Sequence, residues 1–303
     1  MNESMRKYMK VGTILHVAYR GLTTGEGPIL DCLKKIVADP YFEAVEVTQM
    51  KDPAVRKAAA DMIECGHMAV AYGGQPRLLT VGLNINDLDE EKRKIALASL
   101  KEGIDEAYEL NATGFSYLAG KYEEETKEQS YQALVKSTEE LCAYAKSKGD
   151  MPVLIEVFDY DIDKKSLIGP VDLVKRYAEE ITEKWDNFGL MVDLSHIPML
   201  HETVEESLLP VKQYIRHAHM GNTVIKDPSC QAYGDQHPRF GFPDSENDVE
   251  ELAHYLRVLK DIGFLNKENR PIVSFEIKPW GDEDSEVVIA NGKRTLDLAW
   301  ELV

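Results

Sequence analysis

The chain alternates between short runs of apolar, often β-branched residues and longer stretches in which apolar residues recur every three or four positions. The short runs predict buried strands, and the longer stretches predict amphipathic helices. The expected strands are Val11–Ala18, Ala44–Met50, His67–Tyr72, Thr113–Leu118, Pro152–Phe158, Gly189–Leu194, Ile215–Met220 and Pro271–Lys278. The clearest expected helices are Leu88–Leu110, with Asp87 or Asp89 as its cap, Glu125–Lys148, Pro170–Trp185, with Pro170 at its first position, and Asp248–Ile262.

This repeat of strand and helix predicts an α/β fold. Eight such units in 303 residues fit a single (β/α)₈ TIM barrel domain over residues 1–303, since about 250 residues is typical of that fold. The alternative is an open, doubly wound sheet, which normally has a glycine-rich phosphate turn after its first strand. The segment His16-Val17-Ala18-Tyr19-Arg20-Gly21 has no G-x-G-x-x-G pattern. One long irregular segment, Gly221–Asn247, follows the seventh strand, where barrel loops build the active face.

Composition narrows the setting in which the protein acts. Hydrophobic residues make up 44% and charged residues 29%, with a formal net charge of −18. That charge repels phosphate backbones, so we expect no nucleic-acid partner. The apolar runs are far shorter than the roughly 18 residues that span a bilayer, and Met1-Asn2-Glu3-Ser4 lacks an apolar signal core. The four cysteines form no CxxC pair, which favours reduced thiols and a cytoplasmic protein.

Polar side chains interrupt four consecutive strands that should be apolar. Glu156 lies in the fifth strand, Asp193 in the sixth, His217 and His219 in the seventh and Glu276 in the eighth. Alone, each carboxylate could be a cap or an ion-pair partner, and each histidine a core residue. Together they lie where barrel active sites form, and burying unpaired carboxylates is costly. A divalent cation relieves that cost. Three oxygen donors and one imidazole suit Mn²⁺, Mg²⁺ or Co²⁺ better than a closed structural zinc site.

The succession Glu156, Asp193-x-x-His196, His217-x-His219 and Glu276 resembles the xylose isomerase-like TIM barrels. That superfamily includes ketose 3-epimerases, inosose dehydratases, hydroxypyruvate isomerases and endonucleases of the endonuclease IV type. The resemblance extends over the eight strand–helix units of the chain, but its specific residues are those at these strand ends. It implies one divalent ion, Mn²⁺ first among the candidates, bound by Glu156, Asp193, His219 and Glu276. It also implies that His196 lies close to the substrate.

The long loop contains a second block of candidate residues, Tyr233–Gly241. Its Asp235-x-His237 is similar to the pair that holds an additional metal in the endonuclease branch. The net charge and the absence of basic clusters beside the site argue against a nuclease. In a single-metal sugar enzyme, His237 and Arg239 would contact substrate hydroxyls or an oxyanion. The alternative is an ordered loop in which Asp235 and Arg239 pair with each other.

Further candidates line the expected mouth of the barrel. His16 follows Ile14 in phase at the end of the first strand and is expected to line the pocket. Lys278 is in phase with Glu276 and is expected to touch substrate or to form a salt bridge at the rim. Glu46 alternates with Val45 and Val47, which indicates an interior carboxylate paired with a base. Aromatic candidates for an apolar wall or for core packing are Tyr19, Phe158 and Trp280.

The resemblance implies a metal-dependent sugar isomerase or epimerase. Glu156 and Glu276 would ligate the metal and exchange protons on the two sides of the sugar through an enediolate, with either as the base. The ligand set does not choose between epimerisation, isomerisation and elimination, because all three begin with the same proton loss. The loop Tyr233–Gly241 also resembles that of the catalytic α-subunit of C-glycoside deglycosidases, which are lyases acting on 3-keto-glycosides.

The resemblance also bears on partners. A sugar or glycoside is the expected substrate, and the family often forms homo-oligomers. Under the deglycosidase interpretation the partner would be a small β subunit. A sugar-binding barrel without catalysis is the remaining alternative, and the complete ligand set argues against it.

Overall fold

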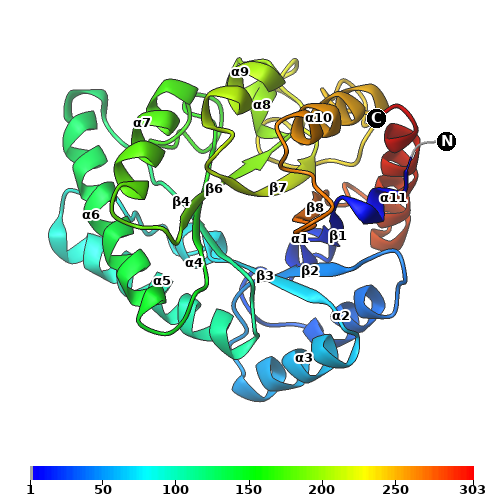
Figure 1. The fold of residues 1–303 in the computed structure, drawn as a ribbon, viewed down its shortest axis with the longest axis horizontal. Coiled ribbons are helices and arrows are strands. Elements are labelled where there is room, and N and C mark those ends of the chain that lie inside the picture. The colour runs from blue at the N-terminus through cyan, green and yellow to red at the C-terminus, as the bar shows by residue number, and fades with distance from the viewer. Residues whose placement is uncertain (1–2) are drawn as a thin grey trace.

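Eight parallel strands form one sheet that closes on itself. In the computed structural model, which describes residues 3–303, neighbouring strands follow the order β1-β8-β7-β6-β5-β4-β3-β2. A parallel bridge between Ile14 and Glu46 then joins the β1 side to the β2 side. Helices surround this barrel (Figure 1). The (β/α)₈ prediction is therefore confirmed and the open-sheet alternative is wrong. The expectation about a secretion signal falls partly on Met1 and Asn2, which lie outside the described residues.

Most observed strands are shorter than expected, except β6, which has the expected length, and β7, which is one residue longer. The strands are β1 (Lys10–Thr13), β2 (Ala44–Val47), β3 (Ala69–Gly73), β4 (Phe115–Leu118), β5 (Val153–Glu156), β6 (Phe188–Asp193), β7 (Ile215–Gly221) and β8 (Ile272–Glu276). The largest difference lies in the first one. Residues 14–18 were expected to continue the strand, but the short helix α1 (Leu15–Ala18) follows β1. A short apolar run has no period that separates strand from helix, and here the amide of Ala18 donates to the Ile14 carbonyl.

The helices that cover the barrel carry the expected starting signals. The long ones are α2 (Ile29–Val37), α3 (Pro53–Cys65), α5 (Glu90–Glu109), α6 (Lys127–Lys146), α7 (Val171–Thr182), α10 (Val249–Asp261) and α11 (Ser285–Glu301). Asp89 caps α5 through the amides of Glu91 and Lys92, as expected. Pro170 was expected at the first position of its helix but is the N-cap residue of α7, one position earlier. Short helices in the connections are α4 (Gln75–Leu79), α8 (His196–Met199), α9 (Val204–Leu208) and the 3₁₀ turns η1 (Met5–Lys7), η2 (Glu124–Thr126) and η3 (Leu209–Val211). Within residues 3–303, no helix has the length and apolar character needed to cross a bilayer.

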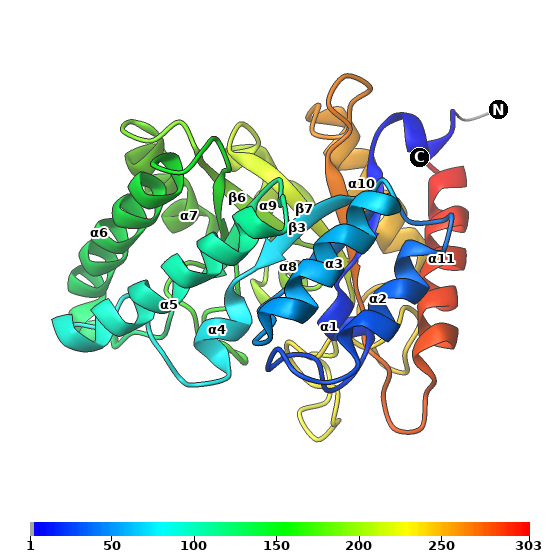
Figure 2. The ribbon, with the colours of Figure 1, turned by 90° about the horizontal axis from the view of Figure 1, so that it is seen from below.

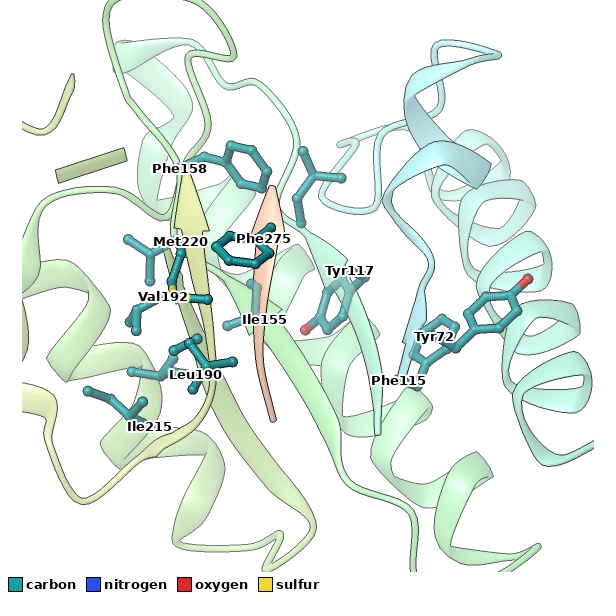
Figure 3. Packing of buried hydrophobic residues seen from close by; sticks show 14 of the residues in the cluster. Tyr72, Phe115, Tyr117, Ile155, Phe158, Leu190, Val192, Ile215, Met220 and Phe275 are labelled. Atoms are coloured by element: carbon teal, nitrogen blue, oxygen red, sulfur yellow. The ribbon is translucent and has the colours of Figure 1, made fainter. Parts of the chain in front are cut away.

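The main hydrophobic core fills the space between the strands and the surrounding helices. Outward-facing strand residues such as Tyr117, Ile155 and Phe275 are fully or almost fully buried there (Figure 3). Tyr72 and Phe115, on neighbouring strands, stack with ring centroids 5.7 Å apart. Because side chains alternate along a strand, this apolar outer layer leaves the other face of each strand for the barrel interior.

The barrel interior has an apolar floor beneath its polar residues. Ala44, Ala71 and Ile272 form a separate small buried cluster, with Ala69 packed against it. Gly12 belongs to the same narrow region, since a Cβ there would lie 2.5 Å from the Ser274 hydroxyl. The small side chains of Ala44 and Ala71, together with Gly12, leave room in the interior for the longer polar side chains at the carboxyl ends of the strands.

A β-bulge sets the direction of the β7 side chains. Leu190 pairs with Ile215, but the next residue of β6, Met191, pairs with His217, so Arg216 is an extra residue. Partners at the same level of a parallel ladder point to the same side. The bulge therefore keeps Ile215 in the outer core and brings His217 and His219 into phase with Asp193.

The loops at the carboxyl ends of the strands form one face of the barrel. In Figure 2 the segment after β7 (yellow) and the loop after β8 (orange-red) project from the side opposite the chain termini. The connection from Asn222 to Asp248 contains no helix or strand, but its two ends are tied together. The amide of Asn247 donates to the Asn222 side chain at 2.8 Å, and the Asn222 side-chain amide donates to the Arg239 carbonyl at 2.8 Å.

The loop after β5 is organised by one buried carboxylate. Asp159 is 0% exposed, and its side chain accepts hydrogen bonds from four consecutive backbone amides, 162–165, at 2.7–3.2 Å. These bonds replace the regular backbone pairing that the loop lacks. They also fix the position of Lys164, whose side chain reaches the barrel mouth.

We expect Asp159→Ala to lower the free energy of unfolding by about 3 kcal/mol, because four amides lose a charged acceptor. Urea denaturation followed by circular dichroism measures this change. Asp161→Ala, in the same loop but half-exposed and paired with His201, is the matched control and should change stability by less than about 0.5 kcal/mol. Equal denaturation midpoints for the two variants would contradict the role given to Asp159.

Candidate metal centre

Four polar side chains from consecutive strands meet at the carboxyl end of the barrel. Glu156 ends β5, Asp193 ends β6, His219 lies near the end of β7 and Glu276 ends β8. One ligand atom from each lies within 4.8 Å of the others. Glu156, Asp193 and His219 are each 2% exposed. The structure therefore brings together all four of the residues expected to bind metal.

Several atoms of this cluster face one another without hydrogen bonding. His219 Nδ1 lies 2.8 Å from Glu276 Oε2 and 3.4 Å from Glu156 Oε1. All three atoms are buried and have no hydrogen-bond partner among the described residues. Buried polar atoms are rarely left unpaired, and carboxylate oxygens with an imidazole nitrogen are a donor set for Mn²⁺, Mg²⁺ or Co²⁺. These residues fit a divalent cation.

Glu46 holds the imidazole of His219 from the other side. Its carboxylate oxygens both lie 3.2 Å from His219 Nε2, and His217 Nε2 donates to Glu46 Oε1 at 2.6 Å. Burial would raise the pKa of Glu46, but the two histidines bring that pKa well below its ordinary value. The carboxylate accepts the proton of Nε2 and leaves Nδ1 directed at the cluster, as in the outer shell of many metal sites. The expectation that Glu46 is an interior carboxylate paired with a base is confirmed.

Asp193 is fixed by the chain that follows it. The Ser195 amide donates to Asp193 Oδ1 at 2.8 Å, and the Ser195 hydroxyl donates to Oδ2 at 2.5 Å. Burial, together with the nearby charge of Glu276, raises the pKa of Asp193. The tight turn from β6 into α8 thus sets the orientation of this carboxylate.

His196, the first residue of α8, lies between acceptors on both sides of its ring. Its Nδ1 is 2.8 Å from the Val157 carbonyl oxygen and its Nε2 is 2.9 Å from Asp235 Oδ1. Burial would lower the pKa of His196, but Asp193 and Asp235 raise it to about 10. Both ring nitrogens therefore donate, and His196 is an imidazolium. Its ring packs against Phe158, with centroids 4.3 Å apart.

Asp235 contacts several of the basic side chains at the mouth of the barrel. His237 Nε2 lies 2.8 Å from Asp235 Oδ1, and Lys164 Nζ lies 2.5 Å from Oδ2. The alternative pairing of Asp235 with Arg239 is wrong. Arg239 Nε instead donates to Glu283 at 2.8 Å, and the structure does not bring Arg239 to the cavity beside the cluster.

A cavity of about 390 Å³ opens next to these residues. That volume lies within the usual range of small-molecule sites, roughly 300–1,000 Å³. Its polar wall residues are His16, Arg20, Thr23, Glu46, Gln75, Glu156, Lys164, His219, Asp235, His237, Glu276 and Lys278. Of the carboxylates in the four-residue cluster, Glu156 and Glu276 line the cavity and Asp193 does not.

His16 and Lys278 lie in this wall, as expected. Burial lowers the pKa of His16 to about 4, so its imidazole is neutral near pH 7. Lys278 donates to the Gln236 side chain at 2.8 Å and its ammonium lies 4.7 Å from the centroid of Trp280. Burial lowers the pKa of Lys278. Both groups are placed to contact a ligand in the cavity.

Sequence reasoning missed four polar wall residues, Arg20, Thr23, Gln75 and Lys164. The Gln75 side chain donates to Glu156 Oε2 at 2.6 Å and occupies one oxygen of that carboxylate. A signal for Gln75 was present, since it lies two residues after the end of the third strand in Gly73-Gly74-Gln75-Pro76. Lys164 lies in a charged stretch, Asp161–Lys165, that resembles an ordinary solvated loop.

A second cavity of about 520 Å³ adjoins the first on the same face of the barrel. The two cavities share Leu79 and Lys164. The other lining residues of the second are Leu78, Gly82, Leu83, Asn84, Leu118, Ala119, Gly120, Lys121 and Asp163. Its walls are joined by hydrogen bonds, since the Asn84 side chain donates to the Lys121 carbonyl at 2.9 Å and the Gly120 amide donates to Asn86 at 2.6 Å.

Fold and site together define an α/β barrel with a carboxylate–imidazole centre at the carboxyl ends of its strands. The chain belongs to the xylose isomerase-like TIM barrel family, whose model matches residues 36–290. No curated protein shows a significant sequence match to the chain.

Solved structures share this fold at low sequence identity. The D-psicose 3-epimerase of Clostridium cellulolyticum H10, crystallised with D-tagatose, superposes with a TM-score of 0.72 at 15% identity, covering 97% of this chain and 99% of its own. The 3-keto-D-glucoside 4-epimerase YcjR of E. coli gives 0.65 at 15%, covering 96% and 98%. The IOLI protein, with a bound zinc atom, gives 0.70 at 17%, covering 97% and 99%.

We expect affinity for Mn²⁺ to rise roughly tenfold per pH unit between pH 5 and 7, because the ion must displace a proton from His219. Burial would lower the pKa of His219, but Glu46 and Glu276 raise it well above the ordinary value. The free protein therefore keeps this proton at neutral pH, and binding becomes easier as pH rises. Calorimetric titrations in buffers of different ionisation enthalpy measure the protons released. Affinity that is independent of pH would contradict this assignment.

Proposed function

We propose that the protein is a divalent-metal-dependent isomerase or epimerase of keto-sugars. The observation that carries this proposal is the convergence of three buried ligand atoms that form no hydrogen bond, on Glu156, His219 and Glu276, at the wall of a cavity large enough for a monosaccharide. The names of the structural neighbours, a D-psicose 3-epimerase and a 3-keto-D-glucoside 4-epimerase, support the same chemistry.

The cation would be held by Glu156, Asp193, His219 and Glu276. When bound, such an ion acts as a Lewis acid toward the carbonyl and the neighbouring hydroxyl of the sugar. Three carboxylates and one imidazole favour Mn²⁺, with Mg²⁺ and Co²⁺ as alternatives.

Proton transfer falls to Glu156 and Glu276, because these two carboxylates of the centre line the cavity. One removes the proton from the carbon beside the carbonyl, and the other returns a proton to the resulting enediolate. The Gln75 amide fixes Glu156 Oε2 and leaves Oε1 unpaired. Glu276 Oε1 lies 3.3 Å from His237 Nε2, which places His237 where it can help to set the protonation state of that carboxylate.

The surrounding cations position the sugar oxygens. Lys164 and Lys278 both line the cavity and can donate to hydroxyl or carbonyl oxygens. The His196 imidazolium stabilises Asp235, and through it the orientation of His237. The neutral imidazole of His16, in α1, adds a group to the cavity wall that can both donate and accept a hydrogen bond.

A second candidate is elimination from a keto-glycoside, the reaction of a C-glycoside deglycosidase α-subunit acting with a small β subunit. The adjoining second cavity favours it. Leu78, Leu79, Leu83 and Leu118 supply apolar walls there, and Leu79 at the junction is 48% exposed. A sugar in the first cavity could place an apolar substituent in the second, where burial of its surface would stabilise binding.

We expect Glu156→Gln and Glu276→Gln each to lower kcat for ketose epimerisation by about a thousandfold, because each removes a proton-transfer group. Chromatographic assays on a panel of ketoses with Mn²⁺ measure this, with metal content determined in parallel. Glu26→Gln, an exposed carboxylate paired with Lys51, is the control and should behave like the wild type. Near-normal turnover in either site variant would exclude it as the proton-transfer group.

The second candidate predicts that an aryl 3-keto-C-glycoside is cleaved with a kcat/KM about tenfold above that of its methyl analogue. Leu83→Ser, in the second cavity only, should remove most of that preference. Leu298→Ser, an exposed leucine of α11, should leave it unchanged. Release of the aglycone is followed by its absorbance. Epimerisation of free ketoses without any aglycone release would exclude this candidate and leave the first one standing.

A further inference from the structure

A second group of ligating side chains lies beside the first and shares Asp193 with it. One atom each from Asp193, His196 and His237 lie within 4.8 Å of one another. Asp235 Oδ1 adds a carboxylate oxygen 2.9 Å from His196 Nε2 and 2.8 Å from His237 Nε2. By residue type and spacing, this group could hold a cation of its own.

The two groups differ in how their polar atoms are satisfied. Three atoms of the first group, on Glu156, His219 and Glu276, have no hydrogen-bond partner. Within residues 3–303, none of the unpaired buried atoms belongs to Asp193, His196, Asp235 or His237. The second group is therefore already closed by protein atoms, whereas the first is not.

The atom that closes the second group is Lys164 Nζ. It lies 2.5 Å from Asp235 Oδ2 and 3.4 Å from Asp163 Oδ2, and the Lys164 side chain is 19% exposed. Burial would lower the pKa of Lys164, but Asp235 and Asp163 raise it, so the ammonium stays charged. Asp163 also accepts the Asp235 amide at 3.0 Å, which ties the two loops together.

The backbone that carries the Lys164 side chain is held in place. Its own backbone amide donates to the fully buried Asp159 at 2.8 Å, within the turn that Asp159 organises. A divalent ion bound by Asp235 and the two histidines would face a fixed positive charge at close range, and Coulomb repulsion in a buried site is strong.

We propose that the Lys164 ammonium takes the place of a second metal ion and restricts the centre to one. The inference rests on the metal centre proposed above and adds to it the residue that determines its nuclearity. A single positive charge satisfies Asp235 permanently, so that His237, which lines the cavity, stays available to the sugar instead of to a metal.

The test is the metal content of Lys164→Met. After equilibrium dialysis against Mn²⁺, we expect about one ion per chain for the wild type and about two for Lys164→Met, because Asp235, His196 and His237 lose their fixed cation. Electron paramagnetic resonance should show the signature of an exchange-coupled Mn²⁺ pair in the variant alone. Neither measurement depends on catalytic activity.

Three further variants make the result specific. Lys164→Arg keeps the charge and should bind about one ion, and Lys278→Met removes a different cation from the same cavity and should also bind about one. Adding Asp235→Asn to Lys164→Met should return the content to about one, because the second ion loses its carboxylate. Thermal melts establish that each variant is folded.

The outcomes separate the two proposals. About one ion in both the wild type and folded Lys164→Met would overturn the role of Lys164 and leave the metal centre intact. Two ions in the wild type, or two in Lys278→Met as well, would also overturn it. No ion in the wild type would overturn the metal centre and, with it, this inference.

Discussion

Burying several carboxylates at one end of a closed barrel is the constraint on which the rest of the site depends. Glu46, Glu156, Asp193 and Asp235 are each 8% exposed or less, and Glu276 lies beside them. Carboxylates this close cannot remain ionised unless positive charge is supplied from within the barrel or from a bound ion.

Positive charge reaches these buried carboxylates in two different ways. On the Asp235 side the positive charge is built in, as the Lys164 ammonium and the His196 imidazolium. On the Glu276 side the positive charge is the proton of His219, which a bound ion would displace, and Glu46 already occupies the other nitrogen of that ring. Fixed cations thus satisfy one half of the mouth, while the other half keeps unpaired ligand atoms directed at a common point. This asymmetry is the basis of the proposal that the protein is a sugar enzyme with one metal ion.

The apolar structure positions these charges. Outward-facing residues such as Tyr117 and Phe275 pack under the helices and fix the position of each strand along the barrel. The last residues of β5, β6 and β8 therefore lie at the same end of the barrel. The apolar floor of Ala44, Ala71 and Ile272 lies beneath them. The carboxylates are therefore held by the strands, whereas Lys164, Gln75 and His237 come from connections that the strands support. Rigid ligands with adjustable surroundings are a common arrangement in barrels of varied chemistry.

Much of this was determined by the sequence alone. Strand and helix periodicity predicted the barrel, and polar residues at the ends of four apolar strands predicted which side chains would meet, because parallel strands in a barrel end on one face. The pattern failed where local signals are ambiguous or absent. Residues 14–18 form a helix after a short strand, and Arg239, beside the conspicuous Asp235 and His237, pairs with Glu283 instead of facing the cavity.

Only the tertiary structure decided the rest. Ile215, His217 and His219 lie two residues apart, so the sequence alone predicts that all three point to the same side of the sheet. The bulge at Arg216 places Ile215 on the outer side and the two histidines on the inner side, because the register depends on the pairing with β6. The sequence pattern predicts that Lys164 is a surface residue, but in the structure the Asp159 turn and the loop after β7 enclose its ammonium. The sequence thus determined which groups carry the charge. Packing between distant segments determined which charges are already paired and which atoms remain for a ligand, since pairing depends on distances that no local pattern encodes.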